Sequence, residues 1–174
     1  MRQLMLLRHA KAVPADGTAD ETRPLAKRGR KGAAAIGAFM VKNGLTPDLA
    51  LVSTSRRTLE TWELLSPVHG KPPHCRPEPR LYAAPAETLL LVVRATPAEV
   101  GALLLIGHNP GLEQFAHALT GSGAAEAMAR FGSKMPTASL AVIDLALDDW
   151  KRAEPQRGRL ELFVTPKSLG AAAD

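Results

Sequence analysis

Arginines and histidines stand directly after three separate apolar runs in this chain of 174 residues. Arg8 and His9 follow the first run. Arg56 and Arg57 come just after the second run, and His108 follows the third. Guanidinium groups bind oxyanions through paired hydrogen bonds, and an imidazole can act as a nucleophile or a proton donor. If these side chains meet in the fold, they form a site for an anionic group such as phosphate.

The three apolar runs predict buried strands of a parallel sheet, because they are continuous and too short to be core helices. They occupy residues 4–7, 48–53 and 102–107. Helical patterns follow each run, at residues 25–43, from Arg56 to about Leu65 with Thr54 or Ser55 as the N-cap, and at 110–119. The carboxyl ends of parallel strands lie at one edge of a sheet, so residues a hundred positions apart can meet there. Asn109 is interpreted as an N-cap ahead of Pro110.

The remaining segments predict shorter elements. Residues 11–24 form a long loop, and loops of that length are uncommon unless they have a function. The middle of the chain predicts a proline-rich loop at 66–79, a short strand at 80–82 and a helix at 85–95. A connection follows at 121–136, with a short helix at 126–131. Two late strands at 139–145 and 160–165 are expected to form a hairpin at the sheet edge. The whole is expected to be one α/β domain over residues 1–174, with residues 170–174 as a frayed tail.

Composition limits the classes of function. The first 80 residues hold 14 Lys and Arg against 7 Asp and Glu, so the half with Arg8 and His9 is basic. The basic residues are not interleaved with aromatic ones and no nucleic-acid-binding motif is present, which argues against a nucleic-acid partner. The single Cys75 cannot form an internal disulfide, and no run is long enough to cross a membrane. We expect a cytoplasmic protein that does not bind membranes.

Arg56 and Arg57 are placed unusually, because arginines in the first turn of a helix face the positive end of the helix dipole. A bound phosphate would remove this penalty. Both arginines could also be solvated surface residues. We expect this of Arg56, whereas the family resemblance described next favours a function for Arg57. His69, His74 and His117 are expected to be structural or surface histidines.

Four segments in their order and spacing give the chain its resemblance to a known family. They are Arg8-His9-Ala10, the segment 53–61 (STSRRTLET), Gly107-His108-Asn109-Pro110, and Asp20-Glu21-Thr22-Arg23-Pro24-Leu25 followed by Gly29. With these segments the chain resembles the histidine phosphatase superfamily, and within it the small SixA-type phosphohistidine phosphatases. The family signature has Gly where this chain has Ala10. The match runs from Met1 to beyond Thr137.

The resemblance implies a phosphoglycerate mutase-like fold, a three-layer α/β/α sandwich with a mostly parallel sheet and late antiparallel edge strands. It implies that His9 attacks phosphorus and becomes a phosphohistidine intermediate, which water hydrolyses. Arg8 and Arg57 would hold the nonbridging oxygens, His108 would be kept protonated by the bound dianion, and Arg23 is a further candidate phosphate ligand. No cofactor or metal is expected, since no residues have metal-ligand spacing.

The general acid is the part of the mechanism with no strong candidate. Larger members of the superfamily carry an acid on an inserted flap for which this chain has no room, which leaves Asp20 and then Glu87. An imidazole leaving group needs far less help from an acid than an alkoxide, and this favours phosphohistidine on a protein as the substrate. The alternatives are a phosphatase for small phosphorylated molecules and a noncatalytic phosphate-binding or interaction module on the same fold.

Overall fold

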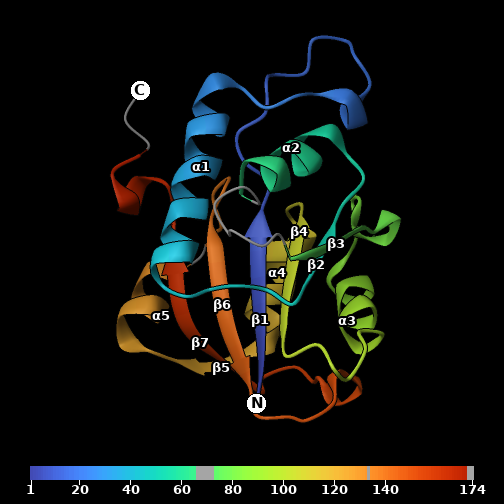
Figure 1. Cartoon of the computed structure of the whole chain (residues 1–174), viewed down its shortest axis with the longest axis vertical. Helices are drawn as coiled ribbons and strands as arrows, with labels where there is room; N and C mark the ends of the chain where they lie inside the picture. Colours follow the sequence, from blue (N-terminus) through green and yellow to red (C-terminus); the bar gives the residue numbers. More distant parts are fainter. Residues whose placement is uncertain (66–72, 133, 172–174) are drawn as a thin grey trace.

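The computed structural model describes residues 1–65, 73–132 and 134–171. A sheet of seven strands forms its centre (Figure 1). The strands are β1 Arg2–Arg8, β2 Leu49–Val52, β3 His74–Pro77, β4 Ala102–Gly107, β5 Thr120–Gly123, β6 Leu140–Leu145 and β7 Gly158–Val164. Their spatial order is β3-β2-β4-β1-β6-β7-β5, so β1 lies at the middle of the sheet.

The three predicted apolar strands are neighbours and run in the same direction. β1 pairs in parallel with β4, and β4 pairs in parallel with β2. Arg8 is opposite Gly107 in this register, and Val52 is opposite Ile106. The ends of the three strands are therefore level, which places the residues that follow them at one edge of the sheet, as predicted.

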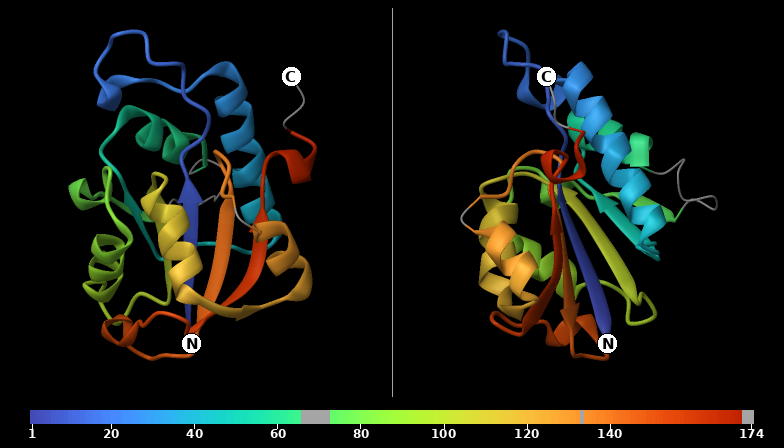
Figure 2. Two further views of the ribbon diagram at one scale, coloured as in Figure 1. Left: turned by 180° about the vertical axis from the view of Figure 1, so that it is seen from behind. Right: turned by 90° about the vertical axis from the view of Figure 1, so that its left-hand side faces the viewer.

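Helices cover both faces of the sheet, and the strand residues alternate between two cores (Figure 2). Leu4 and Leu6 of β1 belong to one core, which includes residues of α3 Ala86–Arg94, α4 Gly111–Leu119 and α5 Ala125–Phe131. Met5 and Leu7 belong to the other, against α1 Lys27–Lys42 and α2 Arg56–Leu65. Burial on both faces explains why β1 is apolar without alternation. The three-layer α/β architecture is confirmed.

The helices begin and end within about two residues of their predicted bounds. The largest difference is at α1, which begins at Lys27 and not at residue 25. Leu25 instead forms a β-bridge with Ala12, and its N–H donates to the Glu60 carboxylate at 2.7 Å. The loop between β1 and α1 is therefore held at both ends against the body of the protein.

The predictions at the two edges of the sheet are wrong. β3 forms one edge where a loop was predicted, and residues 79–81 form a 3-10 helix where a short strand was predicted. Pro79 starts that helix and the Glu78 side chain accepts a hydrogen bond from Arg80 N at 3.1 Å, which caps it. β5 forms the other edge inside the predicted connection at 121–136. Edge strands are half exposed and need no apolar pattern, so their sequences resemble loops.

The two late strands form the predicted antiparallel hairpin. β6 pairs antiparallel with β1 and with β7, and β5 lies outside them, parallel to β7. The hairpin is therefore on the predicted flank of the sheet, although a further strand forms its edge. Residues 66–72, which include His69, and residues 172–174 of the predicted tail lie outside the described residues.

Candidate active site

The residues singled out by the sequence meet at the carboxyl edge of the sheet. Arg8 ends β1 and His9 follows it, Arg57 lies in the first turn of α2, and His108 follows β4. These four side chains line one cavity of about 370 Å³, together with Arg23, Asn109, Thr137 and the segment 11–14. The predicted convergence of the four residues is present in the structure.

His9 is held as a neutral imidazole with one free nitrogen. Its exposed fraction is 8%, and its Nδ1 lies 2.8 Å from the carbonyl oxygen of Ala10. A carbonyl can only accept, so Nδ1 carries the proton and Nε2 carries the lone pair. Burial, and to a smaller extent the nearby His108 and Arg57, lowers the pKa of His9 to about 3. An uncharged imidazole with a free Nε2 is the form that can attack an electrophile.

The turn that carries His9 is fixed to α2. The Ala10 N–H donates to Thr61 Oγ1 at 3.0 Å, and the Thr61 hydroxyl donates to the carbonyl of Arg57 at 2.7 Å. Both bonds are buried, which makes them costly to break. The nucleophile candidate and the arginine candidate are therefore held in a set relation to each other.

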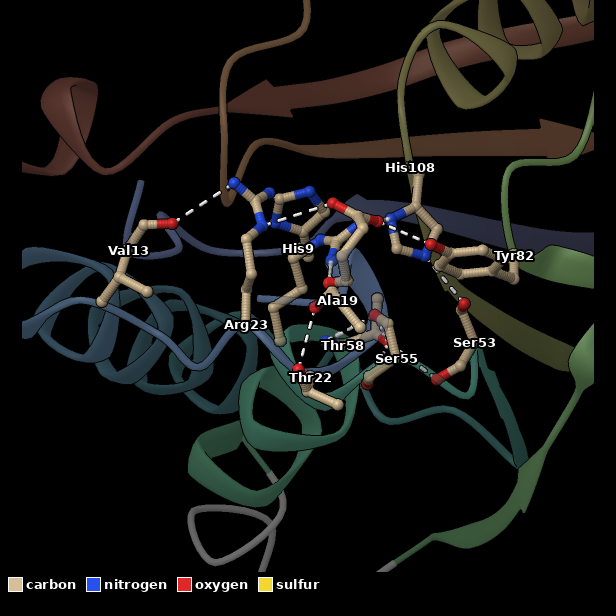
Figure 3. Close-up of polar contacts among 12 residues, drawn as sticks. His9, Val13, Ala19, Thr22, Arg23, Ser53, Ser55, Thr58, Tyr82 and His108 are labelled. Carbon is tan, nitrogen blue, oxygen red and sulfur yellow. Dashed lines mark hydrogen bonds and ion pairs between the residues drawn. The ribbon is translucent and has the colours of Figure 1, made fainter. Parts of the chain in front are cut away.

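His108 lies beside His9 with a ring-centroid distance of 5.2 Å. Arg57 Nη2 donates to His108 Nδ1 at 3.3 Å, so Nδ1 is the acceptor and the Nε2–H points to Ser53 Oγ at 2.7 Å (Figure 3). Burial, followed by the charge of Arg57, lowers the pKa of His108 to about 4. His108 is therefore neutral in this state, whereas the resemblance implied a protonated form with the anion bound. A dianion in the cavity would oppose this shift.

Arg57 is buried and faces the cavity, whereas its neighbour Arg56 faces solvent. The Ser55 side chain accepts from Thr58 N at 3.4 Å and starts α2, which directs the two arginines to different sides. Arg56 pairs with Glu60 on the same helix at 2.8 Å and is 58% exposed. The Arg57 side chain is 6% exposed. The structure thus agrees with the expectation that Arg56 is a solvated surface residue and Arg57 is not.

Asp20 lies against Arg57 at the rim of the site. Arg57 donates to its carbonyl at 2.7 Å and to its carboxylate at 2.9 Å, Tyr82 Oη donates to the same carboxylate oxygen at 2.6 Å, and Arg23 pairs with the other oxygen at 3.3 Å. The hydrogen bond from Tyr82, followed by that from Arg57, lowers the pKa of Asp20. A general acid must carry a proton, so this geometry argues against that role for Asp20 and favours a role in positioning Arg57.

The end of the long loop also brings Arg23 to the cavity. Its guanidinium donates to the carbonyl of Val13 at 3.3 Å (Figure 3). The 3-10 helix Asp20–Thr22 sets the spacing of Asp20 and Arg23 within this loop. The loop of residues 11–24 therefore contributes two charged side chains to the site.

Arg8 and Asn109, which both line the cavity, share one hydrogen-bond acceptor. Arg8 Nη1 and Asn109 Nδ2 both donate to the carbonyl of Met135 at 3.0 Å, and Asn109 Nδ2 also donates to Glu113 at 3.1 Å. The interpretation of Asn109 as an N-cap is wrong, because α4 begins after Pro110 and Asn109 makes no cap hydrogen bond. Its side chain instead ties the segment after β4 to the segment before β6.

Glu87, the second candidate acid, is not among the residues that line the site. It is exposed on the first turn of α3, beside a small apolar cavity formed with Leu90, Phe115 and Leu119. His117 stacks on Phe131 with a centroid distance of 4.1 Å, in agreement with a structural role, and His74 is exposed on β3.

Three polar residues of the site were not singled out as functional from the sequence. Ser53 contacts His108, Tyr82 contacts Asp20 and lies edge-on to the His108 ring, and Thr61 holds the His9 turn. Ser53 and Thr61 lie within the segment that carries the family resemblance, so its pattern contained a usable signal. Tyr82 is brought in by the turn before α3, which no local pattern predicts.

Neither a metal-binding cluster nor a membrane span is found in the described ranges. Residues 1–65, 73–132 and 134–171 contain no group of three His, Cys, Asp or Glu side chains placed to hold a metal ion. The helices within those ranges are too short or too polar to cross a membrane.

A neutral imidazole shares one cavity with the buried Arg57 and the half-buried Arg8 at the carboxyl edge of a parallel sheet. This site defines the class of the protein as an α/β enzyme that acts on phosphoryl groups. The model of the histidine phosphatase superfamily (branch 1) matches residues 4–81. An uncharacterised protein of Mycobacterium tuberculosis is 34% identical over 163 residues, which cover 92% of this chain and 100% of the relative.

Solved structures agree with this comparison. A protein from Agrobacterium tumefaciens assigned as the phosphohistidine phosphatase SixA is 31% identical, with a TM-score of 0.80 over 95% of this chain and 98% of that one. A SixA complexed with tungstate shares the fold at 21% identity, with a TM-score of 0.76 over 96% of this chain and 99% of that one. The chain belongs to the histidine phosphatase superfamily and is a phosphatase of the SixA type.

Proposed function

We propose that the protein removes the phosphoryl group from phosphohistidine on a protein, with His9 as the nucleophile. His9 Nε2 attacks phosphorus, the bond from phosphorus to the leaving imidazole nitrogen breaks, and the phosphoryl group is transferred to His9. Water then attacks the phosphorus of this intermediate, which releases inorganic phosphate and returns His9 to its neutral form. The hydrogen bond from His9 Nδ1 to Ala10 supports this role, because it leaves Nε2 free.

The surrounding charges suit the transferring group. Arg8 and Arg57 line the cavity and supply guanidinium donors, and His108 supplies a second imidazole. Stabilising the charge on the equatorial oxygens is the main task in phosphoryl transfer. On binding, the dianion becomes a further partner of Arg57, which Asp20 holds in place, and raises the pKa of His108, so that His108 donates to an oxygen.

The observation that carries the choice of substrate is the absence of a free carboxyl group at the cavity. Among the described residues, none that lines it is Asp or Glu, and the adjacent Asp20 is held ionised by Tyr82 and Arg57. An alkoxide leaving group needs a proton from such an acid. An imidazole, whose conjugate acid has a pKa of about 6.5, can leave with much less help. The site therefore suits a phosphoramidate better than a sugar phosphate.

The test compares leaving groups on one enzyme. A protein or peptide phosphorylated on histidine, an aryl phosphate and a sugar phosphate are supplied separately, and released phosphate is measured. We expect kcat/KM to be highest for phosphohistidine and lowest for the sugar phosphate. Faster turnover of the sugar phosphate would assign the protein to small-molecule monoesters, and release no faster than with His9→Ala on all three would favour a noncatalytic module.

A further inference from the structure

A second basic cavity adjoins the phosphoryl cavity. It has a volume of about 200 Å³ and lies between the start of α1 and the 3-10 helix Lys167–Leu169 that follows β7. Figure 1 shows this C-terminal segment beside the upper half of α1. The two cavities share Lys11 and Thr137 in their walls, so the second cavity continues directly from the first.

Three cations line the second cavity, and they come from three separate parts of the chain. They are Lys11 after β1, Arg28 on α1 and Lys167. All three are exposed, and none forms an ion pair with a carboxylate in the part of the chain that the structure describes. By contrast, Arg30 and Arg56, which lie close by on α1 and α2, both pair with Glu60. Unpaired cations in one hollow raise the local positive potential and attract an anion.

No carboxylate opposes these cations within either cavity. Of the described residues that line the two hollows, none is Asp or Glu. The positive wall therefore extends from Arg57 and Arg8 through Lys11 to Arg28 and Lys167. Its length exceeds the needs of a single phosphoryl group, which the first cavity already accommodates.

The floor of the second cavity is made by two glycines of α1. A Cβ at Gly29 would collide with the carbonyl of Lys11, and a Cβ at Gly32 would come within 3.2 Å of the Pro166 ring. Glycine at both positions lets α1 approach the Lys11 and Pro166 segments closely. The backbone segments that carry the three cations are therefore packed closely against one another.

We propose that this basic groove, defined by Lys11, Arg28 and Lys167, binds acidic side chains that flank the phosphohistidine in a protein substrate. The inference rests on the proposed function, since it places a polypeptide in the phosphoryl cavity. Carboxylates near the phosphorylated residue then pair with the groove while the phosphoryl group faces His9. The groove selects among phosphorylated proteins without taking part in the chemical step.

The test uses two phosphohistidine peptides that are identical except for their flanks, with Glu residues on both sides in one and Gln residues in the other. At low salt we expect kcat/KM to be about fivefold higher for the Glu peptide, as two or three exposed ion pairs would give. The preference should fall at high salt because the pairs are exposed to solvent. It should also fall below about twofold in the double variant Arg28→Ala/Lys167→Ala.

Lys151→Ala provides the matched control. Lys151 is exposed on a similar short 3-10 helix, Trp150–Arg152, in the connection between β6 and β7. Lys151→Ala removes one positive charge at a distant place, as Lys167→Ala would in the groove, so the preference should remain. Hydrolysis of an aryl phosphate, which reaches only the phosphoryl cavity, should be unchanged in both variants and shows that they are folded.

Each other outcome counts against the proposal in a recognisable way. Equal turnover of the two peptides by the wild type, or an equal loss with Lys151→Ala, would overturn the groove and leave the proposed function intact. Turnover of aryl phosphate with no turnover of either peptide would overturn the proposed function and the groove together. Stronger inhibition of aryl phosphate hydrolysis by a small bisphosphate than by phosphate, lost in the double variant, would assign the groove to a small dianionic substrate and overturn it as a peptide site.

Discussion

Two cavities at opposite ends of the sheet contain arginines, and only one has the features of an active site. The cavity at the amino end of β1, formed by the connection between β6 and β7, is the larger at about 610 Å³. Its Arg152 pairs with Asp148 at 3.1 Å, and its Arg157 pairs with Glu154 at 3.8 Å. All four of these side chains are more than half exposed.

The cavity at the carboxyl end is smaller, but its Arg57 is buried and its Arg8 and Arg23 are half-buried. Arg57 is 6% exposed, and the Nε atoms of Arg8 and Arg57 have no hydrogen-bond partner among the described residues. Burial makes the electrostatic interactions of these groups stronger than those of exposed pairs. Size and charge alone therefore do not identify the site. The site is identified by cations that are shielded from water, lack some of their hydrogen-bond partners and lie beside a neutral imidazole.

The largest expected effect is that of His9→Ala, which removes the proposed nucleophile. We expect kcat for an aryl phosphate to fall by about 10⁴-fold or more, because no other group takes over the covalent step. The matched control is His117→Ala, a histidine on α4 that stacks on Phe131, which should retain activity. Acid quenching during turnover should trap phosphate on His9 in the wild type. Phosphate trapped on another residue would contradict the mechanism.

The next effect separates the two cavities directly. Arg57→Ala should lower kcat/KM by about 10²- to 10³-fold, the loss expected when a buried donor to a transition-state oxyanion is removed. Arg152→Ala, at the opposite end, should change kcat/KM by less than about twofold, since exposed pairs contribute little. Steady-state kinetics with an aryl phosphate measure both. A comparable loss in the two variants would mean that the burial of Arg57 has no catalytic importance.

Asp20→Asn tests whether the carboxylate beside Arg57 positions it or donates a proton. As a positioning residue, Asp20 should give a loss of about tenfold that is the same for substrates with good and poor leaving groups. A general acid would instead give a loss that grows with the pKa of the leaving group. Kinetics across a series of aryl and alkyl phosphates measure this dependence. Asp148→Asn, which alters the corresponding pair at the other cavity, is the control and should have no effect.

The smallest effect concerns stability and pH. The pKa values of His9 and His108 are lowered to about 3 and about 4. Between about pH 6.5 and pH 4 the unfolded chain therefore binds protons at these residues and the folded protein does not. Lowering the pH from 7 to 5 should therefore reduce the free energy of unfolding by about 1 to 2 kcal/mol per histidine. Urea unfolding at the two pH values measures this change in the free energy of unfolding. The double variant His9→Gln/His108→Gln should lose most of this pH dependence, and an unchanged dependence would show that the imidazoles are not buried as described.

The amino-acid sequence by itself determined the central strands, the helices to within about two residues, and the four residues that converge. Long apolar runs specify strands buried on both faces, and a parallel sheet places their carboxyl ends together, so Arg8, His9 and His108 could be assigned without coordinates. The family resemblance of the segment 53–61 added Arg57. The edge strands β3 and β5 could not be found in this way, because a strand with one partner and an exposed face needs no apolar pattern.

Only the tertiary structure decided the protonation and the partners of those residues. The neutral state of His9 depends on burial, and its tautomer depends on the Ala10 carbonyl. The pairing of Asp20 with Tyr82 and Arg57 depends on the way the loop at 11–24 folds over α2. The basic groove depends on the close approach of α1 to the Pro166 segment. Each of these is a contact between segments far apart in the sequence, and its strength depends on how much water the folded chain excludes, which no local pattern encodes.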